Sequence, residues 1–109
     1  MSHYTANLRD IEFCLFDLLG REKVLGTSIY SDLDRDTAMG MLEEMKRLTE
    51  NDLAASFVEG DRIGTDFNKA TGDVKLPESF KKSYKAYVDG EWWRLDAPVE
   101  LGGMKVPAS

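Results

Sequence analysis

The feature that most constrains the fold is a helical repeat of apolar residues near the middle of the chain. Five of them recur every three or four positions: Ala38, Met41, Leu42, Met45 and Leu48. This spacing puts them on one face of a helix, whereas a half-buried strand would need strict alternation. Leu53 and Phe57 are expected to continue the same face, with some drift. Ser31 or Asp34 can cap the start of this helix, and Gly60 is expected to end it.

Two shorter segments have the same period. The first is expected from about Leu8 to Leu19, with Asn7 as its N-cap and Gly20 as its stop. Its apolar stripe consists of Leu8, Ile11, Leu15 and Leu18, widened by Phe16 and Leu19. Cys14 lies within this segment and is expected to be a small buried hydrophobe.

The third helix opens at Pro77, which suits a first helical position, and closes at Gly90. Its expected inner face is formed by Phe80, Tyr84, Tyr87 and Val88. Between 61 and 76 the helical period disappears, and a long loop is predicted, with a small hairpin around Ala70 to Asp73. The sequence therefore predicts an all-α fold of three main helices with a long loop, in which Gly40 allows a close contact between helices.

Charge and composition exclude several classes of protein. The chain has 109 residues, one cysteine and a net charge of −6. The acidic excess lies in residues 1–60, which carry 12 acidic and 6 basic side chains. Such a chain repels nucleic acid and anionic lipid. There is no disulfide framework, no apolar run long enough to span a membrane and no secretory signal at the start, so a cytoplasmic protein is expected.

The end of the chain, from Gly90 onward, places two tryptophans side by side. Adjacent residues on a helix point about 100° apart, so Trp92 and Trp93 cannot share one small pocket. One is expected to anchor the turn after Gly90, and the other to need a second surface. Both are candidate interface residues. A left-handed stop is expected at Gly102 or Gly103, and Pro107 could start another element. This pattern is typical of a fragment, or of a chain completed by a partner.

The order of several short motifs resembles one known family. These motifs are Tyr4, Leu8-Arg9-Asp10, Phe13 and Leu18-Leu19-Gly20, then Leu76-Pro77, Phe80, Tyr84, Gly90 with Trp92, Leu101-Gly102-Gly103 and Pro107. Together they resemble the N-terminal helical part of acyl-CoA dehydrogenases over essentially the whole chain. The most similar subgroup has an extended N-terminal leader and includes methylmercaptopropionyl-CoA dehydrogenases and broad-range actinobacterial fatty acyl-CoA dehydrogenases. Leu101 and Lys105 depart from the family's Tyr and Gly.

The resemblance implies a parent enzyme with a central β domain and a C-terminal helical domain that are absent from residues 1–109. Such enzymes use FAD to take hydrogens from the α and β carbons of an acyl-CoA, with a glutamate as the base. The main flavin contacts and that glutamate lie beyond this chain, so no catalytic, cofactor-binding or metal-binding residue is assigned here. Glu43, Glu44, Glu91 and Glu100 match no catalytic position. FAD and acyl-CoA are expected only for the complete enzyme, which is expected to be a homo-oligomer, and neither FAD nor metal for the isolated chain.

Other candidate sites have plainer interpretations. A CoA phosphate could meet Lys81, Lys82 and Lys85, but a solvated helix face is the better interpretation. Gly102-Gly103 follows no strand and is better explained as a turn than as a phosphate cradle. His3 lacks other ligands around it and is expected to behave like a tag. Core or interface packing is expected for Tyr84 and Tyr87, and core packing for Met39, Met41 and Met45.

Two alternatives to the enzyme fragment stay open. The chain could be a small interaction module that pairs with itself or with a larger dehydrogenase subunit, with the tryptophans as its contact surface. The third hypothesis is a small enzyme or metal protein, which one histidine and one cysteine do little to support.

Overall fold

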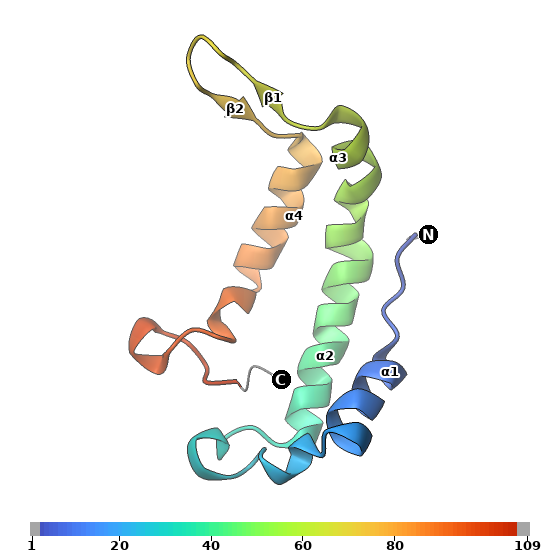
Figure 1. The fold of residues 1–109 in the computed structure, drawn as a ribbon, viewed down its shortest axis with the longest axis vertical. Coiled ribbons are helices and arrows are strands. Elements are labelled where there is room, and N and C mark those ends of the chain that lie inside the picture. The colour runs from blue at the N-terminus through green and yellow to red at the C-terminus, as the bar shows by residue number, and fades with distance from the viewer. Residues whose placement is uncertain (1–2, 107–109) are drawn as a thin grey trace.

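The computed structural model describes residues 3–106. Its longest element is a continuous helical rod in which α2 (Arg35–Leu48) runs into α3 (Phe57–Ile63). The two are joined by a π-helical stretch (Thr49–Leu53) and a 3-10 turn (Ala54–Ser56). In the view of Figure 1, α4 (Glu78–Asp89) lies to the left of this rod and α1 (Leu8–Glu12) to its right. The mostly helical fold predicted from the sequence is confirmed.

Both predicted caps of the first two helices are present. The amide of Asp10 donates to the side-chain oxygen of Asn7 at 3.3 Å. Asp34, rather than Ser31, caps α2 by accepting from the amide of Thr37 at 2.8 Å. These bonds satisfy backbone donors that have no partner inside the helix, which fixes where each helix begins.

The stretch between α3 and α4 contains a short hairpin. Strand β1 (Asp66–Phe67) pairs antiparallel with β2 (Val74–Lys75), and Phe67 lies opposite Val74. Figure 1 shows the hairpin projecting beyond the ends of the helices. The predicted hairpin is therefore confirmed, but the loop begins later than expected because α3 continues to Ile63 and ends at Gly64, whose φ is 67°.

The predicted stop at Gly60 is wrong, because α3 continues through it to Ile63. Gly60 instead makes a contact between helices. Gly60 lies buried inside α3, and a Cβ added there would lie 2.0 Å from a ring carbon of Phe80 on α4. Gly40, for which a close contact was expected, has no atom within 4 Å of such a Cβ. The close approach is therefore between α3 and α4, at the α3 end of the rod, and not at Gly40 in α2.

The expected face of the long helix is also wrong at its end. Phe57 is 62% exposed, whereas Ser56 is buried and donates to the carbonyl of Leu53 at 2.9 Å. The π-helical stretch at Thr49–Leu53 explains the change, because a π turn contains an extra residue and shifts every later side chain around the axis.

The first helix shows the same effect. It continues from α1 through a π-helical stretch, Phe13–Leu18, so the predicted extent is confirmed. Phe16 is buried, but Ile11, Leu18 and Leu19 are exposed. Cys14 is exposed as well, so its expected burial is wrong.

The inner face of α4 carries small residues instead of the predicted aromatic row. Tyr84 is 71% exposed, and Val88 is also exposed. Ser83 is buried, and its hydroxyl donates to the carbonyl of Asp52 at 2.7 Å. The small serine lets α4 lie close to the rod, which a tyrosine at that position would prevent.

The described residues form only a small core. Phe16 and Leu48 are the buried apolar residues. The accessible surface is 8067 Å², about 2,000 Å² more than size scaling gives a folded monomer of this mass. The radius of gyration is 17.6 Å, against about 13 Å for a compact domain of this length. The chain therefore exposes much more surface than a self-contained domain of its size.

Candidate functional site

The structure separates the two tryptophans of the tail. They lie on a 3-10 turn, Trp92–Arg94, directly after α4. Trp92 is half-buried, with its ring against Gly90, where an added Cβ would lie 2.6 Å from the indole nitrogen. Trp93 is 44% exposed. The ring of Trp92 thus packs in the turn after α4, whereas the ring of Trp93 is largely exposed at the surface.

The rest of the tail folds back on this turn. The Nε of Arg94 donates to the carbonyl of Gly102 at 2.6 Å, and the amide of Met104 donates to the carbonyl of Arg94 at 2.8 Å. The amide of Val106 donates to the carbonyl of Leu95 at 3.1 Å. The left-handed turn expected in this region lies at Gly102, whose φ is 86°. These bonds make the tail a closed loop.

An apolar cavity of about 150 Å³ lies between this loop, α2 and the segment after α1. Its lining is Leu15, Phe16, Arg21, Val24, Leu25, Leu33, Ala38, Met41, Leu42, Met45, Trp92, Leu95 and Val106. The helical repeat of α2 supplies one wall, which includes Met41 and Met45. Met39, Met41 and Met45, for which core packing was expected, are all half-buried. The three segments meet without filling the space between them.

One polar atom in the cavity wall has no partner. The Nε of Arg21 is buried and donates to none of the described residues. A buried donor without an acceptor costs roughly 1–3 kcal/mol. Sequence analysis did not single out Arg21, because no nearby motif distinguishes it from a surface arginine.

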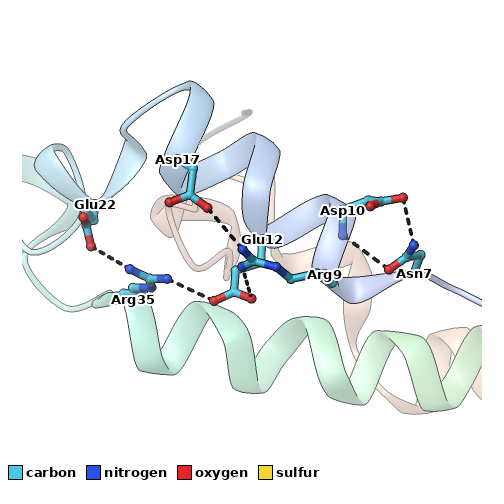
Figure 2. A network of polar contacts seen from close by, with 7 residues as sticks. All are labelled: Asn7, Arg9, Asp10, Glu12, Asp17, Glu22 and Arg35. Atoms are coloured by element: carbon cyan, nitrogen blue, oxygen red, sulfur yellow. Dashed lines mark hydrogen bonds and ion pairs between the residues drawn. The ribbon is translucent and has the colours of Figure 1, made fainter.

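A polar network holds the first helix onto α2 (Figure 2). Arg35, the first residue of α2, donates to Glu12 at 3.0 Å and to Glu22 at 3.2 Å. Arg9 also donates to Glu12, at 3.1 Å, and lies 3.9 Å from Asp17. Each arginine therefore bridges two carboxylates from different turns of the chain.

The network shifts the ionisation of its members. The hydrogen bond from Arg35, and then that from Arg9, lowers the pKa of Glu12 below its usual range. The same contacts raise the pKa of Arg35, with Glu12 contributing most. Arg35 also lies over the ring of Phe16, with its guanidinium carbon 4.6 Å from the ring centre. The cation–π contact joins the network to the small core. Sequence reasoning missed this group because its charges are far apart along the chain.

The remaining candidates behave as ordinary surface groups. Lys81 pairs with Glu78 at 2.6 Å, and Lys85 pairs with Asp89. Both pairs lie within one turn of α4, and all three lysines of the cluster are exposed, as a solvated helix face requires. His3 is in contact with the chain, contrary to its expected tag-like behaviour: its ring lies 4.8 Å from that of Phe57.

The geometry also bears on metal and membrane sites. Within residues 3–106, no group of three histidine, cysteine or acidic side chains is placed to hold a metal ion. No helix in the same range has the length and apolar character needed to cross a membrane.

Comparison with known proteins extends over nearly the whole chain. It is 50% identical over 98% of its length to the broad-specificity linear acyl-CoA dehydrogenase FadE5 of Mycobacterium tuberculosis. It is 36% identical over 95% of its length to the 3-methylmercaptopropionyl-CoA dehydrogenase of Ruegeria pomeroyi. The chain is related to acyl-CoA dehydrogenases. It spans only 18% and 17% of the lengths of these two relatives. No protein-family model matches it.

Proposed function

We propose that this chain is the N-terminal helical segment of an FAD-dependent acyl-CoA dehydrogenase, which introduces a double bond between the α and β carbons of an acyl-CoA. The observation that carries the proposal is the 50% identity to a broad-specificity linear acyl-CoA dehydrogenase over 98% of the chain. In this proposal the segment packs against the flavin-binding β domain and the C-terminal helical domain of a cytoplasmic homo-oligomer.

The candidate phosphate contacts among the described residues have other partners. The amides of Gly102 and Gly103 donate to the carbonyls of Val99 and Pro98, so neither is free to hold a phosphate. Lys81 and Lys85 are each paired with a carboxylate of their own helix. We therefore assign FAD, acyl-CoA and the catalytic base to the remainder of the enzyme and derive no chemical step from this segment.

The exposed surface supports a packing role. The excess of about 2,000 Å² is more than twice the area that one partner buries in a standard interface, about 800 Å². Exposed large apolar side chains occur on every α-helix and strand except α2: on α1 and the segment after it, on α3, on both strands, on α4 and on the tail. Contacts of this extent are typical of packing within one protein rather than of a transient encounter.

The first experiment is to determine the mass of the native protein that carries this sequence, with an antibody raised against residues 3–106. A species several-fold heavier than 12.3 kDa, with a flavin absorption spectrum and acyl-CoA oxidation, is expected. A native species of 12.3 kDa would overturn the proposal. So would stoichiometric flavin binding and acyl-CoA oxidation by the 109-residue chain alone.

A second candidate is a stand-alone interaction module that associates with itself or with a larger dehydrogenase subunit. The observation that favours it is that three large apolar side chains of the tail are exposed, those of Trp93, Val99 and Leu101. A native mass of 12.3 kDa, together with co-purification of a dehydrogenase subunit or self-association that Trp93→Ala abolishes, would support this candidate. A monomer that retains no partner would overturn it.

A further inference from the structure

Two charge-assisted hydrogen bonds attach the first helix to the rod. Just before α1, the amide of Ala6 donates to Oε1 of Glu50 at 2.9 Å. At the last residue of α1, Glu12 accepts from Arg35 at 3.0 Å, as Figure 2 shows. Hydrogen bonds with an ionised partner are stronger than those between neutral groups. Because the two bonds lie near opposite ends of α1, they act together to hold it on the rod.

Apolar packing contributes little to this attachment. None of the residues of α1 is buried. Leu8 is half-buried, whereas Ile11 is exposed. Before α1, the ring of His3 lies 4.8 Å from that of Phe57, which is itself 62% exposed. Among the described residues, the first buried side chain is that of Phe16, in the π-helical stretch after α1. Since burial of apolar surface is normally the main attraction between packed elements, the two polar bonds carry a large share of the attachment of α1.

The charged groups that the rod side contributes each have a second partner that does not belong to α1. Glu50 lies 3.7 Å from Lys46, which is also part of the rod. Arg35 donates to Glu22, at 3.2 Å, in the 3-10 turn Arg21–Lys23. Breaking a bond is most costly when it leaves a polar group without a partner. Neither Glu50 nor Arg35 would lose its last partner if α1 moved away from the rod.

The moving part would keep its own bonds as well. Glu12 accepts from Arg9 at 3.1 Å, and both belong to α1. Asn7 accepts from the amide of Asp10, so α1 keeps its N-cap. Directly after α1, the π-helical stretch Phe13–Leu18 offers a hinge, because sharp bends in helices occur at π turns. A bend there would move α1 without moving the buried ring of that stretch.

We propose that residues 3–12 form a polar latch, which closes on the rod through the Ala6–Glu50 and Glu12–Arg35 bonds and opens about the π-helical stretch while the rest of the chain stays folded. Segments with few buried apolar contacts open locally at a lower free energy than global unfolding requires. Ionic strength controls the latch, because salt screens the partly exposed Glu12–Arg35 pair. The proposal uses contacts among the described residues and does not depend on the proposed function.

The test is hydrogen–deuterium exchange, followed by mass spectrometry, on the complete protein that carries this sequence. Hydrogen-bonded amides in residues 6–13 should exchange at least about tenfold faster than those in residues 39–48 of α2, because local opening releases only the former. Raising the salt concentration from about 0.05 M to about 0.5 M should speed exchange in residues 6–13 about two- to fivefold, since it weakens an ion pair of modest strength. Exchange in residues 39–48 should not change.

Two variants test the latch bond at Ala6. Glu50→Ala removes the acceptor and should speed exchange in residues 6–13 about tenfold, the factor for one lost hydrogen bond to a charged group. Glu44→Ala is the matched control, because Glu44 is a glutamate of the same rod that pairs with Arg47 of its own helix at 3.0 Å. It should leave exchange in residues 6–13 unchanged. Neither variant should alter exchange in residues 82–89 of α4.

Two results would overturn the proposal. The first is exchange in residues 6–13 that is as slow as in α2 and insensitive to salt, which would mean that the first helix leaves the rod only when the whole molecule unfolds. The second is an equal effect of Glu50→Ala and Glu44→Ala on residues 6–13, or a Glu50→Ala variant that speeds exchange in every helix alike. The native-mass experiment can succeed while this one fails, and the reverse, so the two proposals are tested separately.

Discussion

At the scale of single residues, the structure gives several side chains roles that their residue type does not suggest. Gly60 is a contact point between helices, and Ser83 is a buried donor that ties α4 to the rod. Tyr84, which has a large ring, is exposed instead of buried. Small residues occupy the places where two helices come closest, because only a small side chain leaves room for the other backbone.

Gly60→Ala is expected to lower the free energy of unfolding by about 1–3 kcal/mol, because the new methyl overlaps the ring of Phe80. Gly40→Ala is the matched control. It lies exposed in α2 with nothing near its Cβ position, and should raise that free energy by about 0.5–1 kcal/mol. Urea unfolding measures both changes in the native-length protein, that is, the complete protein that carries this sequence in its cells. Equal effects of the two substitutions would contradict the contact.

The two tryptophans give a second prediction. Trp92→Ala should lower the free energy of unfolding by about 2 kcal/mol, since it removes one wall of the cavity and the contact with Gly90. If the rest of the enzyme covers Trp93, then Trp93→Ala in the native-length protein should cost more than about 1 kcal/mol. A change within about 0.5 kcal/mol would show that Trp93 stays on the surface.

At the scale of elements, the two π-helical stretches decide which faces point inward. One follows α1 and the other follows α2, and the apolar period of the sequence predicted each of these regular helices. The position of an extra residue leaves no mark in that period, so Phe57 and Leu18 are expected on the wrong face; Ile11 precedes the first π-helical stretch, and its exposure has no such explanation. The hairpin depends on local turn chemistry and was predictable from the sequence, whereas capping chemistry left Ser31 and Asp34 open for the start of α2 and the structure selects Asp34.

The Arg35 network is also an element-scale feature, because it joins the first helix to α2. Glu12→Gln should lower the melting temperature at pH 7. Glu12 has a lowered pKa in the folded protein, so its stabilising contribution is complete above the unfolded pKa and is lost as the pH falls through the folded pKa. The difference in melting temperature between Glu12→Gln and the wild type should therefore disappear at acid pH.

Glu78→Gln is the control for this measurement. Its pKa is also lowered, by the hydrogen bond from Lys81, but that pair lies within one turn of α4 and joins no two elements. Its effect on the melting temperature at pH 7 should be clearly smaller, because exposed pairs of this kind contribute little. A larger effect at Glu78 than at Glu12 would show that the network does not hold the helices together.

At the scale of the whole molecule, a long rod, one flanking helix on each side and a projecting hairpin enclose little interior (Figure 1). The molecule measures 54 × 36 × 21 Å. Within residues 3–106, the hydrophobic core consists of Phe16 and Leu48, which is small for a chain of this length. Hydrophobic burial is the main favourable contribution to folding, so the described residues by themselves gain little stability from their core.

The isolated 109-residue chain is accordingly expected to unfold without a sharp transition and to bind the dye ANS, as a loosely packed state does. The native-length protein should unfold cooperatively and bind little dye. Near-ultraviolet circular dichroism of the two forms provides an independent check. A sharp thermal transition of the isolated chain would show that the small core is sufficient.

The sequence by itself determined the helices, their caps, the hairpin and the family, because these depend on periodicity, local hydrogen bonding and the order of motifs along the chain. Only the tertiary structure decided which faces are buried, where the helices touch and that Arg21 lines an apolar cavity. Those features depend on π turns and on long-range neighbours such as Gly60 with Phe80, or Trp92 with the residues after α1 that line the same cavity. Such residues come together only when the chain has folded, so their spacing along the sequence does not reveal them.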